Sequence, residues 1–251
     1  SSDGGSPATN EDGGGGSTGT DDGGGPGTGS TLAHCGDPPY ITLSIAVEAV
    51  SSTDPKPRVE GAVLTSPNCP DASFTSDADG GIVGLVSQNV PFYGRFNASG
   101  YAPTLSPEEK FPTDTSDVFV DLPPSLINII VPNYDANKPT VFVDVLLDGG
   151  HAKDGGANCN DPSGVTFGVV DHPEAIVTYY APGTVPTAVS GGTSTTSAGI
   201  ASITGLDSSV GPITLTATKT GCTVATVKDT ATGRLPLENG YISIAPVYLH
   251  D

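Results

Sequence analysis

The sequence predicts an all-β protein in which two tandem β-sandwiches follow a Gly-rich N-terminal arm. Short runs of alternating apolar and polar residues, typical of half-buried strands, recur along most of the chain. No segment shows a sustained apolar period of about 3.6 residues, so almost no helix is expected. A unit of turn, strand, loop and strand also occurs twice, at residues 75–104 and 195–226, which indicates that both sandwiches use one β-unit.

The first 33 residues are predicted to be a flexible arm. Residues 1–31 are rich in Gly and Asp and contain neither Lys nor Arg, and Leu32 is the first large apolar residue of the chain. Such a segment cannot bury enough apolar surface to offset the entropy lost on ordering. The two sandwiches are therefore expected at 34–133 and 134–251, since a domain of this kind has about 100 residues.

In the first sandwich, Tyr40–Val50 is the clearest strand, because its alternation places every second residue from Ile41 to Val47 on one face. The stretch SPNCPD, which contains Cys69, is expected to be a loop. The other predicted strands are Arg58–Leu64, Gly81–Ser87, Val90–Ala98, Asp117–Leu122 and Leu126–Val131.

In the second sandwich, Val141–Leu147 alternates in the same way, and a polar loop from Asp148 to Gly164 follows it. The further predicted strands are Val165–Val170, Ile176–Tyr180, Val185–Val189, Gly199–Leu206, Pro212–Lys219, Thr223–Val227 and Tyr241–Tyr248.

The charge of the chain excludes two classes of partner. The net charge is −19, from 9 basic and 28 acidic residues. Nucleic acid and anionic membrane surfaces both require clustered Lys and Arg, so neither is an expected partner. No apolar run approaches the roughly 18 residues of a membrane span, so no transmembrane segment is expected.

Four cysteines, Cys35, Cys69, Cys159 and Cys222, lie two in each predicted sandwich. Of the three possible pairings, this distribution favours Cys35–Cys69 and Cys159–Cys222. Each bridge would close a loop worth about 3–4 kcal/mol in the chain-entropy model, and disulfides indicate an oxidising compartment. Four buried free thiols and a four-cysteine metal site are the alternatives.

Four motifs of the first half resemble those of one known family. In order they are a V-x-G-x-V strand, a D-x-D-G turn, a strand of alternating apolar residues and a G-Y corner; they are VEGAV at Val59–Val63, DADGG at Asp77–Gly81, GIVGLV at Gly81–Val86 and ASGYAPT at Ala98–Thr104. Residues 58–126 thus resemble carboxypeptidase regulatory-like domains, which are transthyretin-like, seven-stranded, Ig-like sandwiches. The second half matches less well, since TTSAG replaces the turn and Cys222 replaces the corner Tyr.

This resemblance implies a stalk, spacer or binding module. The first residues also resemble the tether that follows the lipidated cysteine of bacterial surface lipoproteins, and Ser1 would suit the first residue after removal of a signal peptide.

Two acidic residues are candidate ligands of Ca²⁺. Asp77 and Asp79 alternate before Gly80 and Gly81, an arrangement that can present carboxylate and backbone oxygens to a hard cation. Asp and Gly are also ordinary turn residues, and the acidic residue at the twelfth position of an EF-hand loop is missing. Turn formation is therefore the preferred interpretation.

Two further groups are weaker candidates for metal or acid–base chemistry. The first is the polar loop Asp148–Asp161, and the second is His172 with its neighbours Asp171 and Glu174. A solvated loop is the simpler interpretation of the first, and the second needs partners that converge from elsewhere.

No catalytic residue and no cofactor is predicted, because the G-x-S-x-G elbow and the P-loop and dinucleotide fingerprints are all missing from the sequence. We interpret the chain as a non-catalytic extracellular or cell-surface binding or spacer protein with a protein or glycan partner. The alternative is a structural subunit of an extracellular filament, which self-associates by strand addition at an exposed sheet edge.

Overall fold

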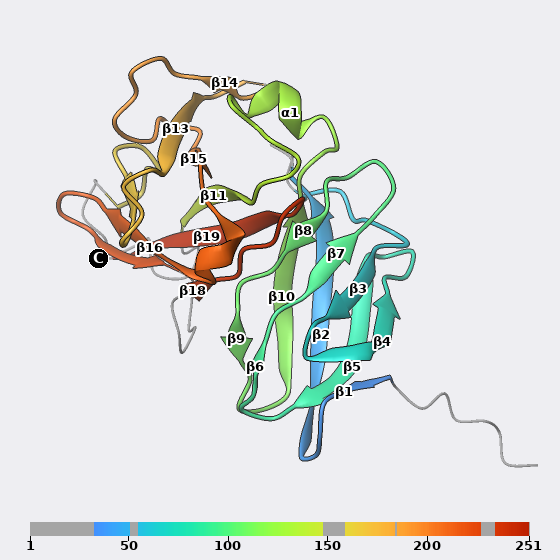
Figure 1. Cartoon of the computed structure of the whole chain (residues 1–251). Helices are drawn as coiled ribbons and strands as arrows, with labels where there is room; N and C mark the ends of the chain where they lie inside the picture. The colour runs from blue at the N-terminus through green and yellow to red at the C-terminus, as the bar shows by residue number, and fades with distance from the viewer. Residues whose placement is uncertain (1–32, 51–54, 148–158, 184, 227–233, 251) are drawn as a thin grey trace, which may run out of the picture. The chain divides into compact units, whose positions relative to one another are not determined.

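The computed structural model describes residues 33–50, 55–147, 159–183, 185–226 and 234–250 (Figure 1). The predicted arm lies almost wholly outside these residues. Within them the regular secondary structure is almost all strand, which confirms the predicted all-β class.

The first sheet of the first half has the strand order β1-β5-β2-β10. Its strands are β1 (His34–Cys35), β5 (Gly81–Ser87), β2 (Tyr40–Ala49) and β10 (Thr115–Leu122). Strand β2 is antiparallel to β5 and parallel to β10. The predicted alternation of β2 is confirmed, because every second side chain from Ile41 to Val47 is buried.

The second sheet of this half contains β4, β3, β7 and β8, in that order. Their bounds are Cys69–Thr75 for β4, Val63–Ser66 for β3, Arg95–Asn97 for β7 and Thr104–Leu105 for β8. One apolar core joins both sheets: Leu43 and Ile45 of β2 belong to the same cluster as Leu64, Phe74 and Phe96.

The second half repeats this plan. One sheet runs β14-β13-β15-β11-β19, with β17 also paired to β19, and the other runs β12-β16-β18. The strands of the first sheet are β14 (Thr187–Ala188), β13 (Ile176–Ala181), β15 (Ile200–Thr204), β11 (Thr140–Leu147), β19 (Ile242–His250) and β17 (Thr223–Thr226). Those of the second sheet are β12 (Thr166–Val169), β16 (Ile213–Thr218) and β18 (Arg234–Leu235). Strand β11 is antiparallel to β15 and parallel to β19, as β2 is to β5 and β10. In each copy of the repeated unit, the first strand (β5 or β15) lies in one sheet and the second strand (β7 or β16) lies in the other.

One predicted strand is wrong. Residues Leu126–Val131 contain α1 (Ile127–Ile130), a single helical turn after two prolines. Ile127 and Val131 are buried and lie four residues apart, whereas Ile129 between them is 72% exposed. A strand would place residues 127, 129 and 131 on one face, whereas a helix returns to the same face after four residues but not after two. The exposure of Ile129 between two buried neighbours therefore favours the helical turn.

Other segments differ in detail. The predicted strand Val90–Ala98 is interrupted: β6 (Pro91–Phe92) pairs with β9 (Glu109–Lys110), and β7 joins the other sheet. Gly94 lies at the crossing, where an added Cβ would be 2.4 Å from Leu64 Cδ1. The chain between sheets therefore passes too close to the core for a side chain.

Two errors concern β3 and β4. Strand β3 begins only at Val63, because Glu60 and Gly61 form a turn in which Gly61 has φ +72°. The stretch around Cys69, predicted to be a loop, instead begins β4, which pairs with β3 through a tight turn after Ser66.

The two halves are joined by a shared sheet. Strand β19 pairs in parallel with β8 through Ile242↔Thr104 and Ser243↔Leu105, so the sheet containing β4 and β8 continues into that containing β11. A third apolar cluster combines residues of both halves: Ala102, Ile127, Val131, Phe142, Ile242 and Ile244. The division at residues 133 and 134 stays a prediction. In the part of the chain that the structure describes, no helix has the length and apolar character needed to span a membrane.

Candidate functional site

The four cysteines form two disulfides, Cys35–Cys69 and Cys159–Cys222. The first connects β1 to the start of β4 and therefore joins the two sheets of the first half. The second ends one residue before β17. These pairs are those that the distribution of cysteines favours, and in this structure no thiol is left to act as a nucleophile or metal ligand.

Asp77 caps the turn that precedes β5. Its Oδ1 accepts hydrogen bonds from the backbone N–H groups of Asp79, at 3.0 Å, and Gly81, at 2.7 Å. Gly80 has φ +72°, and an added Cβ there would lie 2.7 Å from the carbonyl oxygen of Val47. The geometry is that of a tight Asx-type turn. Among the described residues no group of three His, Cys, Asp or Glu side chains is placed to hold a metal, and calcium binding at Asp77 and Asp79 stays a prediction.

We expect Asp77→Ala to lower the free energy of unfolding by about 1–2 kcal/mol, because two backbone donors lose a charged acceptor. Asp79→Ala is the matched control, since Asp79 is exposed at the same turn and its carboxylate caps neither N–H group. Urea unfolding with and without Ca²⁺ measures both effects. Equal losses in the two variants would contradict the capping role, and a rise in stability with Ca²⁺ that either substitution abolishes would establish the calcium site.

In the described part of the chain, neither of the two weaker candidates brings together a set of side chains that could hold a metal. Residues 148–158 of the polar loop lie outside the described residues. The carboxylate of Asp161 accepts hydrogen bonds from the backbone and side chain of Ser163, which lower its pKa. His172 Nδ1 lies 2.8 Å from Glu174 Oε1, and this local hydrogen bond lowers the pKa of Glu174.

Tyr179 and Tyr180 are both buried, so neither presents an exposed aromatic platform for a sugar. The hydroxyl of Tyr179 accepts a hydrogen bond from the Phe167 backbone N–H at 2.9 Å. The hydroxyl of Tyr180 lies 2.8 Å from Ser202 Oγ. Tyr179 belongs to the apolar core of the second half, whereas Tyr180 is buried outside that cluster.

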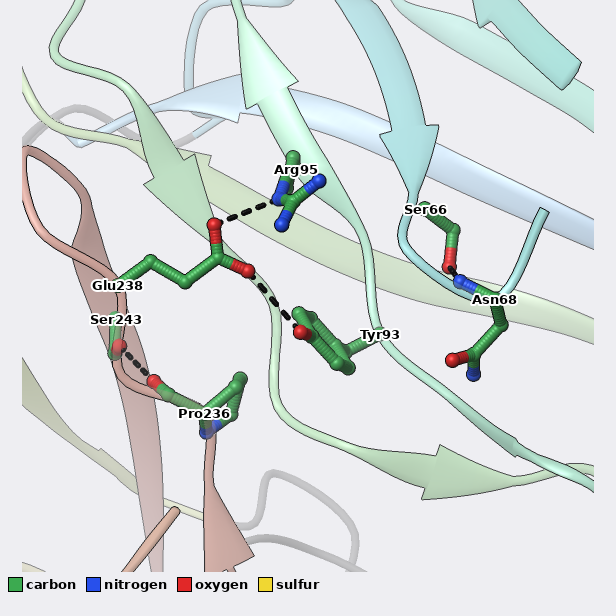
Figure 2. Close-up of polar contacts among 7 residues, drawn as sticks. All are labelled: Ser66, Asn68, Tyr93, Arg95, Pro236, Glu238 and Ser243. Carbon is green, nitrogen blue, oxygen red and sulfur yellow. Dashed lines mark hydrogen bonds and ion pairs between the residues drawn. The ribbon is translucent and has the colours of Figure 1, made fainter. Parts of the chain in front are cut away.

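Glu238 clasps the two halves together (Figure 2). It lies between β18 and β19, and its Oε2 accepts a hydrogen bond from Arg95 Nε of β7 at 2.7 Å. The hydroxyl of Tyr93 donates to its other oxygen at 3.0 Å. Burial and the charge of Glu238 raise the pKa of Tyr93 to about 12, so the hydroxyl stays protonated and the clasp keeps its second donor at physiological pH.

A second charged group also spans the halves. Lys56 Nζ lies 2.6 Å from Asp121 Oδ2 of β10 and 3.9 Å from Asp144 Oδ2 of β11. All three side chains are largely buried, between 15% and 28% exposed. Burial alone would lower the pKa of Lys56, but its hydrogen bond to Asp121 raises it overall, so the ammonium remains charged.

An apolar groove adjoins this charged group along the edge of β10. Its apolar lining includes Phe92, Phe111, Val118, Phe119, Leu146 and Pro246. In the described part of the chain β10 pairs only with β2, so the groove follows a sheet edge. Such an edge can accept an extended segment of another chain.

The titration of Asp144 tests whether its ionised carboxylate, beside Lys56 and Asp121, stabilises or destabilises the folded state. Burial raises its pKa from 3.8 to about 6, with Lys56 opposing the shift and Asp121 adding to it. A raised carboxyl pKa means that the ionised form destabilises the folded state, by an amount that grows between pH 4 and pH 6 and persists above it. Asp144→Asn should therefore match the native protein at pH 4 and exceed its free energy of unfolding by about 1–3 kcal/mol at pH 8.

Urea unfolding at pH 4 and pH 8 provides the measurement. Asp71→Asn removes an exposed carboxylate of the first half and controls for the change in net charge. If Asp144→Asn proved less stable than the native protein at pH 8, the ion pair with Lys56 would outweigh the burial of the charge.

Sequence reasoning did not identify Glu238, Lys56, Asp121 or Asp144. One signal was present: Asp144 is the single acidic residue within the apolar strand VFVDVLL, and Asp121 follows the apolar run VFV in DVFVDL. A charge at such a position needs a partner, although the sequence does not name it.

No family model and no curated protein matches the chain. The resemblance to carboxypeptidase regulatory-like domains therefore stays a prediction.

Several solved structures show a low overall similarity. GBS52, the minor pilin of Streptococcus agalactiae, is 12% identical with a TM-score of 0.27, over 84% of this chain and 96% of that one. The major pilin T-13 of Streptococcus pyogenes is 10% identical with a TM-score of 0.23, over 84% and 96%. The Bacillus anthracis TIE protein is 12% identical with a TM-score of 0.24, over 83% of this chain but only 34% of that protein. Similarity at this level carries no argument about function.

Proposed function

We propose that this protein is a non-catalytic extracellular or cell-surface module that acts as a spacer and binds a protein or glycan partner. The observation that carries the proposal is the continuous sheet between the two disulfide-bonded sandwiches, through the β8–β19 pairing. The Glu238 clasp and the shared apolar cluster reinforce that junction. A spacer needs such a junction, because a loose linker would not hold a binding surface at a defined distance.

The two disulfides support the extracellular location, since such bonds persist in oxidising compartments. Several polar groups that the sequence offered for chemistry have structural roles in the described part of the chain: Asp77 caps a turn, His172 pairs with its neighbour Glu174, and the cysteines are bonded. This supports a binding or structural role rather than catalysis.

The test is to locate the native protein and the redox state of its cysteines. Intact cells are treated with an external protease, and the cysteines are mapped by non-reducing peptide analysis. Release of fragments from intact cells with both disulfides present supports the proposal. Protection from protease in intact cells, together with free thiols at all four positions, would overturn it.

A filament subunit is the second candidate, and the apolar groove along β10, the last strand of its sheet, favours it. Light scattering and electron microscopy of the purified protein separate the two cases. A particle near the chain mass of 25.1 kDa supports the spacer, whereas ordered fibres support the filament.

A further inference from the structure

In each half, the first long strand lies parallel to the last one. Strand β2 pairs with β10 from Leu43↔Thr115 to Ala49↔Leu122. Strand β11 pairs with β19 along its whole length, from Thr140↔Ile242 to Leu147↔Leu249. The first long strand of each half is thus hydrogen-bonded to its last strand; in the first half only the two-residue strand β1 precedes β2 in the described chain.

This arrangement determines how the strands respond to tension. In a parallel pair, the start of one strand and the end of the other lie at opposite ends of the ladder. Pulling on those two points slides the strands past each other, so all the inter-strand hydrogen bonds carry the load together. Pulling on two points at the same end of a ladder would instead break the bonds one after another.

We propose that this chain is a tension-bearing module, built to resist force applied between its two ends. The proposal rests on the proposed function as a surface spacer, because a spacer that holds a partner is pulled along its length. In the second half, β19 is held on both sides, since Thr223–Thr226 of β17 pairs with its last residues and β11 with its full length. Extraction of β19 must therefore slide it past two strands.

The disulfides limit how far force can extend each half. Cys35–Cys69 encloses β2 and β3 in a loop with a sequence separation of 34, and Cys159–Cys222 encloses β12 to β16 with a separation of 63. Force applied between the chain ends cannot extend the residues inside a disulfide-closed loop until the disulfide is reduced. Cys222 also immediately precedes β17, so the second bond anchors the strand that flanks β19.

Single-molecule force spectroscopy on the full chain tests the proposal. With handles at the two chain ends, we expect high-force unfolding events, one for each half. A second molecule carries one handle at Leu147, which is 40% exposed at the end of β11, and the other at the C-terminus. These points lie at the same end of the β11–β19 ladder, so rupture should need a force at least about twofold lower, because the bonds no longer share the load.

Reductant provides an independent readout of the enclosed loops. After each half unfolds, reduction should release about 120 Å of further extension from the first loop and about 230 Å from the second, at up to about 3.6 Å for each residue. Circular dichroism of the Leu147-handle molecule verifies that it is folded before it is pulled.

Equal rupture forces in the two geometries, or lower force between the chain ends, would overturn the proposal. This outcome is separate from the cellular test above. A surface protein that unfolds at low force would refute only the tension-bearing role, and an intracellular protein with high force would refute only the spacer function.

Discussion

Replacing both Cys159 and Cys222 by serine is expected to lower the free energy of unfolding by about 4 kcal/mol. The bond closes a loop with a sequence separation of 63, and in the chain-entropy model such a loop restricts the unfolded state by about that amount. Because natural domains have only about 5–15 kcal/mol of stability, the second half should be much less stable at 37 °C. Urea unfolding under non-reducing conditions, followed by circular dichroism, measures the loss.

The matched variant replaces Cys35 and Cys69, which close a shorter loop with a separation of 34. The model gives a slightly smaller loss, also of about 4 kcal/mol. If the halves unfold independently, each pair of substitutions should shift one transition and leave the other unchanged. A loss below about 1 kcal/mol in both variants would show that strand pairing alone carries the stability that we assign to the bonds.

The second large effect is expected from Phe96→Ala, with a loss of about 3–5 kcal/mol. Phe96 lies on β7, is 0% exposed, and packs in the core that joins the two sheets of the first half. Truncation removes a large apolar side chain and leaves a cavity that the surrounding strands cannot fill. Thermal or urea unfolding of the purified variant gives the magnitude.

Phe119→Ala is the control for this substitution. Phe119 lies on β10 of the same half but is 56% exposed, so its truncation should change stability by less than about 1 kcal/mol. Similar losses in the two variants would mean that Phe119 is covered in solution. The groove that it lines beside β10 would then be an occupied interface, in agreement with the filament candidate.

Local pattern was sufficient for most of the strands. The bounds of β5, Gly81–Ser87, were predicted exactly as they are observed, and β2 and β11 within one residue. These strands alternate apolar and polar residues between Gly or Pro turns, and both signals lie within a few residues of one another. The shortest strands, such as β1, β8 and β18, were not predicted, because two residues carry no period.

The helical turn α1 shows where local pattern is insufficient. LINIIV reads as a strand by composition, yet Ile127 and Val131 both enter a cluster that includes Phe142 and Ile242. The pairing of β8 with β19 brings residues of both halves next to one another in that cluster. The distant contacts therefore selected a local conformation that the β-branched residues alone do not favour.

By itself the sequence determined the all-β class, the two-fold use of one β-unit and the distribution of cysteines that favours the observed disulfides. These features depend on the side-chain period, turn residues and chain spacing, which are local properties. The tertiary structure alone decided the sheet shared by the two halves, the Glu238 clasp, and the group formed by Lys56, Asp121 and Asp144. Each of these joins residues far apart in the sequence, and a buried charge or an unpaired strand edge indicates a need for a partner without specifying which residue meets it.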